Sequence, residues 1–173
     1  TVPLTRGSRG CVVVRDNVIQ EIGNLIKLKE TPILIYDQIS FLTRNEHEQR
    51  RTKVQTFIES WRQAWEGNNL ESYMKFYDPS FEAPGFKYKS WMRHKQNLKS
   101  NYEFIHVGLS KPYILEHRNQ LVIKTLQRYE SNKHVDYGVK MIYAVSDGDS
   151  FKILREEWAP ADPPRLSAQD SRR

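Results

Sequence analysis

The spacing of the apolar residues changes near residue 101, and this change constrains the fold more than any other feature of the chain. Before it, apolar residues from Val54 to Trp65 recur at steps of three and four, which is typical of an amphipathic helix, and Gly67 would end that helix. Beyond it, the pattern has a period of two and predicts strands over 103–116, 120–130, 134–146 and 151–158. Helices followed by long antiparallel strands predict an α+β domain, with the helices packed on a four-stranded sheet.

Two further helices are expected in the first half of this domain. One begins at Asn69 and is stopped by Asp78-Pro79, and another covers about 89–100. Charged residues dominate 43–53, which fits a linker or an exposed first helical turn, and we assign 41–53 to a linker. The last residues, 160–173, contain three prolines and no periodicity, so we expect a disordered tail.

Residues 1–40 have a different pattern. Val12-Val13-Val14 predicts a short buried strand, residues 18–28 a helix, and Ile33-Leu34-Ile35-Tyr36 a second strand. A strand–helix–strand piece of this size is too small to bury a core by itself. We therefore expect Val12, Val14, Ile33 and Ile35 to have exposed apolar area.

Composition excludes several classes of protein. No apolar run approaches 18 residues, so no membrane-spanning helix is expected. A single cysteine excludes an intrachain disulfide and a thiolate zinc site, and no metal-ligand spacing or cofactor motif is present. With 27 basic and 21 acidic residues the net charge is +6, which favours an anionic partner. The chain lacks a recognisable DNA or RNA motif, so we do not expect nucleic acid to be that partner.

The segment Ser8-Arg9-Gly10-Cys11 allows two interpretations. A lone cysteine before three valines is commonly a buried strand residue. Alternatively, Cys11 is a nucleophile, because an adjacent arginine favours the thiolate and the backbone N–H groups near a glycine can stabilise an oxyanion.

The string Ser-Arg-Gly-Cys, followed by three valines, a helix and Thr-Pro-Ile-Leu-Ile, resembles the end of the L,D-transpeptidase (YkuD-type) catalytic domain. The resemblance covers about residues 5–37 and implies that Cys11 attacks a peptidoglycan stem peptide to form an acyl-enzyme. By the same resemblance Ser8 and Arg9 shape the site, and Gly10 lies against the oxyanion. The family's partner histidine would precede residue 1, so we expect this chain to be inactive by itself.

The segment from Phe57 to Trp65, followed by Tyr73 to Tyr77, resembles the start of a nuclear transport factor 2-like (SnoaL-like) domain. The likeness continues to residue 159 and implies a cone-shaped fold over 54–159. A YkuD-type ending followed by such a domain is similar to the arrangement in some L,D-transpeptidases and L,D-carboxypeptidases of helical Gram-negative bacteria. They imply a periplasmic or cell-envelope location and peptidoglycan stem peptides as partners, with a homodimer as a candidate assembly.

Candidate binding residues lie in the second domain. Five basic residues occur without an intervening acid: Lys87, Lys89, Arg93, Lys95 and Lys99. They form either a solvated helix face or a surface that binds the carboxylates of peptidoglycan. Aromatic residues that could line a pocket, or simply belong to the core, are Trp91, Tyr137 and Trp158. His106 and Asp136 are expected to be exposed strand residues.

The sequence therefore favours the C-terminal portion of a cysteine L,D-transpeptidase or L,D-carboxypeptidase with an accessory substrate-binding domain. The alternative is a non-catalytic binding or scaffold module of the cell envelope, in which Cys11 is structural.

Overall fold

The computed structural model describes residues 12–28, 31, 33–36, 38, 41–67 and 69–163. The chain divides into two compact units, Thr1–Ser40 and Phe41–Arg173, and each is described by itself. Ser8, Arg9, Gly10 and Cys11 lie outside the described residues, as do residues 164–173 of the expected tail.

In the first unit the described regular element is the helix α1 (Asp16–Gly23), which begins and ends earlier than the sequence predicts. The two strands expected at 12–14 and 33–36 are wrong, since neither segment is a strand. A strand requires a neighbouring backbone to satisfy its N–H and C=O groups, and the described residues of this unit supply none. The expected exposure is confirmed: Val12 is 62% exposed and Ile33 is 76% exposed.

The second unit begins with the long helix α2 (Arg44–Glu66). Its start is fixed by a capping box, in which the Thr43 hydroxyl accepts from the Glu46 N–H and the Glu46 carboxylate accepts from the Thr43 N–H at 2.8 Å. The segment assigned to a linker is therefore mostly helix, and the alternative of an exposed start of the helix is the one that holds. Its charged side chains are exposed, because α2 reaches the core only from Val54 onward.

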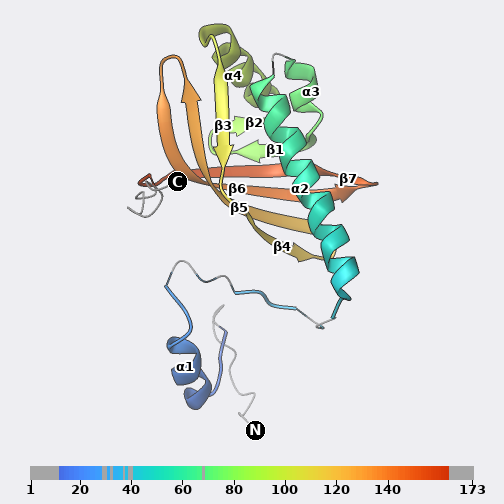
Figure 1. The fold of residues 1–173 in the computed structure, drawn as a ribbon, viewed down its shortest axis with the longest axis vertical. Coiled ribbons are helices and arrows are strands. Elements are labelled where there is room, and N and C mark those ends of the chain that lie inside the picture. Colours follow the sequence, from blue (N-terminus) through green and yellow to red (C-terminus); the bar gives the residue numbers. More distant parts are fainter. Residues whose placement is uncertain are drawn as a thin grey trace, which may run out of the picture. The chain divides into compact units, whose positions relative to one another are not determined.

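Two shorter helices follow α2, as the sequence predicts. They are α3 (Leu70–Met74), capped by the Asn69 side chain, and α4 (Tyr88–Asn101). Figure 1 shows α2 crossing the sheet, with α3 and α4 beside its C-terminal half. Among the described residues, no helix has the length and apolar character needed to cross a membrane.

The sheet has seven strands rather than the four expected. Their bounds are β1 (Tyr77–Ala83), β2 (Phe86–Lys87), β3 (Ile105–Leu109), β4 (Tyr113–His117), β5 (Gln120–Ser131), β6 (Val135–Asp147) and β7 (Ser150–Pro160). The order is β2-β1-β7-β6-β5-β3, and β4 pairs with the other half of β5. The strand expected over 103–116 is therefore divided between β3 and β4, with Pro112 between them, because proline cannot donate to a ladder.

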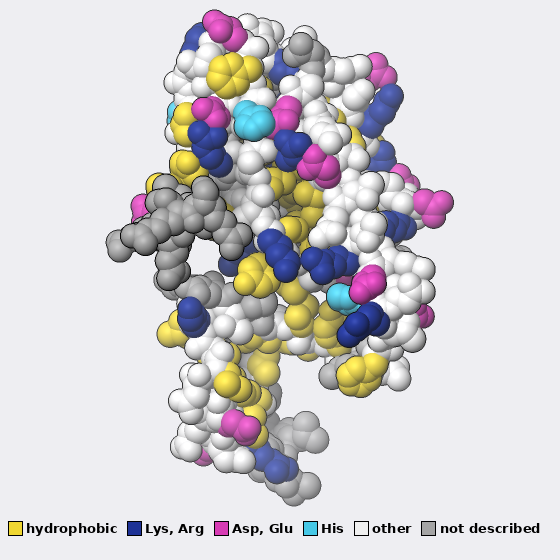
Figure 2. Space-filling view, in the orientation of Figure 1, with side chains coloured by type: hydrophobic (Ala, Val, Ile, Leu, Met, Phe, Trp, Pro, Cys, Tyr) yellow, Lys and Arg dark blue, Asp and Glu magenta, His cyan; other side chains and the backbone are white. Residues whose placement is uncertain are grey.

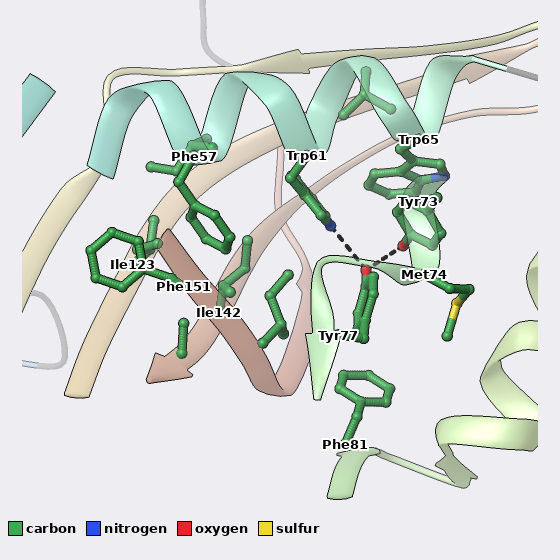
Figure 3. Packing of buried hydrophobic residues seen from close by; sticks show 14 of the residues in the cluster. Phe57, Trp61, Trp65, Tyr73, Met74, Tyr77, Phe81, Ile123, Ile142 and Phe151 are labelled. Atoms are coloured by element: carbon green, nitrogen blue, oxygen red, sulfur yellow. Dashed lines mark hydrogen bonds between the residues drawn. The ribbon is translucent and has the colours of Figure 1, made fainter. Parts of the chain in front are cut away.

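One face of the sheet packs against the helices and is called the inner face here. On β5 the odd-numbered residues from Leu121 to Ser131 are buried, and on β6 the even-numbered residues from Gly138 to Ala144. The inner face packs against Phe57, Trp61 and Trp65 of α2, as Figure 3 shows. The helices and the inner face thus enclose one aromatic-rich core.

Candidate ligand-binding site

The basic run of α4 divides between two sides of the helix. Lys87, Lys89 and Arg93 are exposed, whereas Lys95 is only 5% exposed and lies in the core. Lys99 is partly buried and donates to the Gly67 carbonyl just after α2. The expectation of five cations on one surface is therefore wrong. In a helix, residues four apart share a face, so Lys95 faces inward together with Trp91.

Lys95 lies in a cage of aromatic rings. Its Nζ is 3.9 Å from the ring centroid of Trp65 and 4.4 Å from that of Trp91. The Tyr73 ring lies further away, at 5.7 Å. Such cation–π contacts partly replace the water that a buried ammonium group loses.

The sheet contributes a second buried cation and an anion to the same interior. Lys140 of β6 is 4% exposed and Glu156 of β7 is 2% exposed, and their side chains form an ion pair. The Lys140 Nζ also lies 5.5 Å from the Trp65 centroid. Trp65 therefore lies against both buried lysines, and two ammonium groups face one carboxylate.

Glu156 is held in place by a network of hydroxyl groups. The Tyr77 hydroxyl donates to Glu156. It also accepts from the Trp61 indole N–H at 2.9 Å, as Figure 3 shows. Because the proton of Tyr77 is engaged with Glu156, Tyr73 must be the donor in its hydrogen bond to Tyr77. Burial, reinforced by the charge of Glu156, raises the pKa of both tyrosines well above the usual 10, so both remain protonated donors.

Around Lys95, by contrast, two donors lack an acceptor. The indole N–H groups of Trp65 and Trp91 are buried without a hydrogen-bond partner among the described residues. The Lys95 Nζ lies over both of these rings. Burial lowers the pKa of Lys95 to about 7, with the charges of Lys140 and Lys99 acting in the same direction and Glu156 opposing them.

This arrangement is suited to binding an anion. Buried donors without acceptors are costly to leave unpaired, and a carboxylate could accept from the ammonium and from an indole N–H together. A carboxylate would also neutralise the positive charge that Glu156 alone does not balance. We refer to Lys95, Trp65, Trp91, Lys140 and Glu156 as the lysine cluster. No group of three metal-ligating side chains occurs in the residues that the structure describes.

The three aromatic residues singled out by the sequence have different positions. Trp91 belongs to the lysine cluster, and Trp158 is 41% exposed on the same side of the sheet, with its ring against Gly138. Tyr137 lies on the opposite face, where its hydroxyl accepts from Arg128 at 3.0 Å, so its expected place in the pocket is wrong. His106 is exposed as expected and contacts Glu66, with its Nδ1 at 3.1 Å from the carboxylate.

The exposed cations do not make up a single basic surface on the face shown in Figure 2. There, Lys and Arg side chains are interspersed with Asp and Glu side chains. Lys87, for example, pairs with Glu82 at 3.3 Å across the β1–β2 hairpin. On this face, the positive charge that an anionic partner could bind is therefore largely balanced by neighbouring carboxylates.

Sequence reasoning did not single out Trp65, Lys140 and Glu156 as candidate site residues. A signal for Lys140 was present, because it lies at the same alternating positions of its strand as the buried Ile142 and Ala144. A charged residue at a core position of a period-two strand is rarely buried unless it is paired. Glu156 is harder to find, because β7 changes register between Ile153 and Arg155 and the alternation shifts there.

A family model described as the Cds6 C-terminal NTF2-like domain matches residues 53–157. The chain belongs to this family. The resemblance to the nuclear transport factor 2-like fold is thereby confirmed, including its mixed α+β class. No match was found among curated proteins.

Solved structures extend the comparison. The chain is similar to Bd1075 of Bdellovibrio bacteriovorus, with 62% identity and a TM-score of 0.87 over 95% of this chain and 59% of Bd1075. The fold is also shared by the helical cell shape determining protein Pgp2 of Campylobacter jejuni, with 20% identity and a TM-score of 0.68, over 86% of this chain and 53% of Pgp2. A putative dehydratase of the NTF2-like family from Streptomyces avermitilis has a TM-score of 0.61 at 12% identity, over 68% of this chain and 99% of the dehydratase. The chain thus spans less than two thirds of Bd1075 and of Pgp2.

Proposed function

We propose that the NTF2-like domain binds peptidoglycan stem peptides through their carboxylates, as the accessory domain of a cysteine L,D-transpeptidase or L,D-carboxypeptidase in the periplasm. The observation that carries the binding role is the lysine cluster, in which two indole N–H groups are buried without an acceptor beside the buried Lys95 ammonium. Stem peptides bear free carboxylates, the chemical group that these donors lack.

The enzymatic part of the proposal is supported by Ser8-Arg9-Gly10-Cys11 and its resemblance to the end of a YkuD-type domain. One comparison supports a role in the cell envelope, because Pgp2, which shares the fold, is named as a determinant of helical cell shape. In this proposal Cys11 is the nucleophile, Ser8 and Arg9 shape the site, and Gly10 lies at the oxyanion.

The binding role can be tested by pull-down of the chain with purified peptidoglycan sacculi. We expect Lys95→Met to abolish most of the binding, because methionine keeps the side-chain volume but removes the ammonium. The matched control is Lys87→Gln/Lys89→Gln/Arg93→Gln, which removes three exposed cations from the same helix. This control should change binding only slightly, since exposed pairs are each worth about 0.2–1 kcal/mol.

The proposal is overturned if Lys95→Met binds sacculi as well as the unchanged chain while the triple variant does not. That result would assign binding to the exposed side of α4. A thermal melt of each variant, followed by circular dichroism, establishes that the loss is not caused by unfolding.

The nucleophile is tested separately by alkylation of Cys11 at neutral pH. A catalytic thiol held as thiolate reacts within minutes, whereas a structural buried cysteine resists the reagent. Slow labelling in the chain together with equally slow labelling in a longer protein that includes the preceding region would contradict the catalytic role.

A further inference from the structure

The Lys95 side chain has the properties of a chemically reactive amine. It is only 5% exposed, and its Nζ lies over the rings of Trp65 and Trp91, which shield it from water. Burial lowers the pKa of this amine to about 7, so a large fraction of it is uncharged at neutral pH. An uncharged lysine amine has a free electron pair, which makes it a nucleophile.

The donors around Lys95 are suited to an anion formed on Lys95 itself. Trp65 and Trp91 each have an indole N–H that is buried without a hydrogen-bond partner among the described residues. The Trp65 ring centroid also lies 5.5 Å from the Nζ of Lys140, a second buried lysine. Buried donors are costly to leave unpaired, so negatively charged oxygens covalently attached to the Lys95 Nζ would be stabilised here.

We propose that Lys95 is a carbamylation site, at which its side-chain amine reacts reversibly with carbon dioxide. The electron pair of the uncharged Nζ attacks the carbon of CO2 and forms an N–C bond, while one C=O electron pair moves onto oxygen. The Nζ then releases one proton to the buffer, which leaves a carbamate with one negative charge. The flexible four-carbon stem of lysine lets the Nζ turn within the aromatic cage to accommodate the added atoms.

The charged groups that act on Lys95 favour this product on balance. Lys140 and Lys99 are cations, whereas Glu156 is an anion that already pairs with Lys140. His94 does not add a competing positive charge at neutral pH, since burial and the charge of Lys95 lower its pKa below the usual 6.5. Carbamylation thus replaces one of three neighbouring cations by an anion. Dry surroundings also protect the carbamate from the protonation that releases CO2 again.

Carbon NMR of the 173-residue chain in isotope-labelled bicarbonate at pH 7.5 tests the proposal directly. We expect a carbamate signal, separate from those of bicarbonate and CO2, that is absent from Lys95→Met. The α-amino group and exposed lysines react with CO2 to a small extent, so Lys89→Met is the matched control and should keep the signal. The absence of any Lys95-dependent signal at saturating CO2 would overturn the proposal.

A second variant tests whether the indole donors hold the carbamate. Trp65→Phe keeps an aromatic ring beside Lys95 but removes one buried N–H, so the apparent affinity for CO2 should fall roughly tenfold. The control is Trp158→Phe, which removes an indole from a partly exposed position of β7 and should leave that affinity unchanged. Thermal melts establish that both variants are folded. Equal affinities in Trp65→Phe and the unchanged chain would overturn the geometry on which the proposal rests.

Carbamylation should also compete with peptidoglycan binding, a consequence that rests on the proposed function. A carbamate reverses the charge of Lys95 and occupies the indole N–H groups, so bicarbonate should weaken sacculus binding relative to chloride at the same ionic strength. A Lys95-dependent carbamate signal in a chain that does not bind sacculi supports the modification and overturns the binding role. Sacculus binding that requires Lys95, in a chain without such a signal, does the reverse.

Discussion

The Lys95 ammonium lies 4.4 Å from the Trp91 ring centroid, one helical turn away along α4. Their shared face explains why two residues from a charged, polar stretch belong to the core. It also separates Lys95 from its exposed neighbours Lys89 and Arg93, which precede and follow Trp91 in the sequence. A basic run along a helix is thus not one functional unit.

Replacing Lys95 by methionine should raise the free energy of unfolding at pH 6. The folded-state pKa of Lys95 is about 7, well below the 10.5 usual for lysine, so below pH 7 the folded protein carries a costly buried charge. Between about pH 7 and pH 10 the unfolded chain binds more protons than the folded one, so the stability of the unchanged protein rises with pH. The advantage of Lys95→Met should therefore shrink at pH 9.

Urea unfolding at both pH values measures this difference, with Lys89→Met as the exposed control on the same helix. An advantage of the same size at pH 6 and pH 9 would show that Lys95 does not titrate in this range.

Carboxylate binding should weaken as the pH rises above about 7. The charged groups acting on Lys95 are Lys140, Lys99 and Glu156, and together with burial they give its ammonium a pKa of about 7. Deprotonation removes both the charge and the donor that a carboxylate requires. Binding to purified peptidoglycan sacculi, measured from pH 5.5 to 8.5, should fall in the unchanged chain, and pH-independent binding would contradict this role of Lys95.

Removing one member of the buried ion pair should be far more costly than removing Lys95. Lys140→Met breaks the buried ion pair with Glu156, and removing one partner of such a pair typically costs about 3–5 kcal/mol. The double variant Lys140→Met/Glu156→Gln should recover most of this loss, because a neutral amide can still accept from Tyr77. A double variant no more stable than Lys140→Met would refute the explanation based on an unpaired charge.

Gly138→Ala should destabilise the domain. A methyl group at this position of β6 would meet the Trp158 ring and the Ala159 carbonyl oxygen, and the backbone oxygen cannot rotate away. Overpacking of this kind typically costs about 1–3 kcal/mol. The control is Gly108→Ala in β3, where the atom nearest to the added methyl group would be 3.7 Å away. The measurement is the midpoint of thermal unfolding of each variant. Equal midpoints for the two variants would contradict the prediction.

Thr43→Ala should lower stability by about 1 kcal/mol, because it removes the hydroxyl that caps α2. Thr52 provides a control within the exposed part of the same helix, where Thr52→Ala should be neutral or slightly stabilising. Equilibrium urea unfolding of residues 41–173 would detect the difference, and equal effects of the two substitutions would argue against the cap.

The helices and the long strands could be predicted because their signals are local. The apolar spacing from Val54 to Trp65 defines a helix face, and the alternation in β5 and β6 defines a buried sheet face. High charge density alone leaves residues 43–53 open between a linker and an exposed first helical turn, and the capping-box spacing of Thr43 and Glu46 is the signal that favours the helix.

The edge of the sheet could not be predicted in the same way. β1 contains Asp78 and Pro79, which are unfavourable in strands, yet it pairs in parallel with β7 from Tyr77 to Glu82. The register shifts between those two residues, and Pro79 lies in the irregular stretch where no ladder bond is required. Pairing of this kind depends on residues far along the chain, as does the contact of Lys140 with Glu156.

The parallel pairing of β1 with β7 has a consequence for how the domain is assembled. Tyr77 cannot meet Ile153 or Glu156 until residues 77 to 156 have all been made, so the loop between them must close late. Until β7 docks, Lys140 has no counter-ion and the hydroxyl of Tyr77 has no carboxylate to bind. Until then β6 is an unpaired edge of the sheet, and the pairing of β7 with β6 and β1 completes the domain.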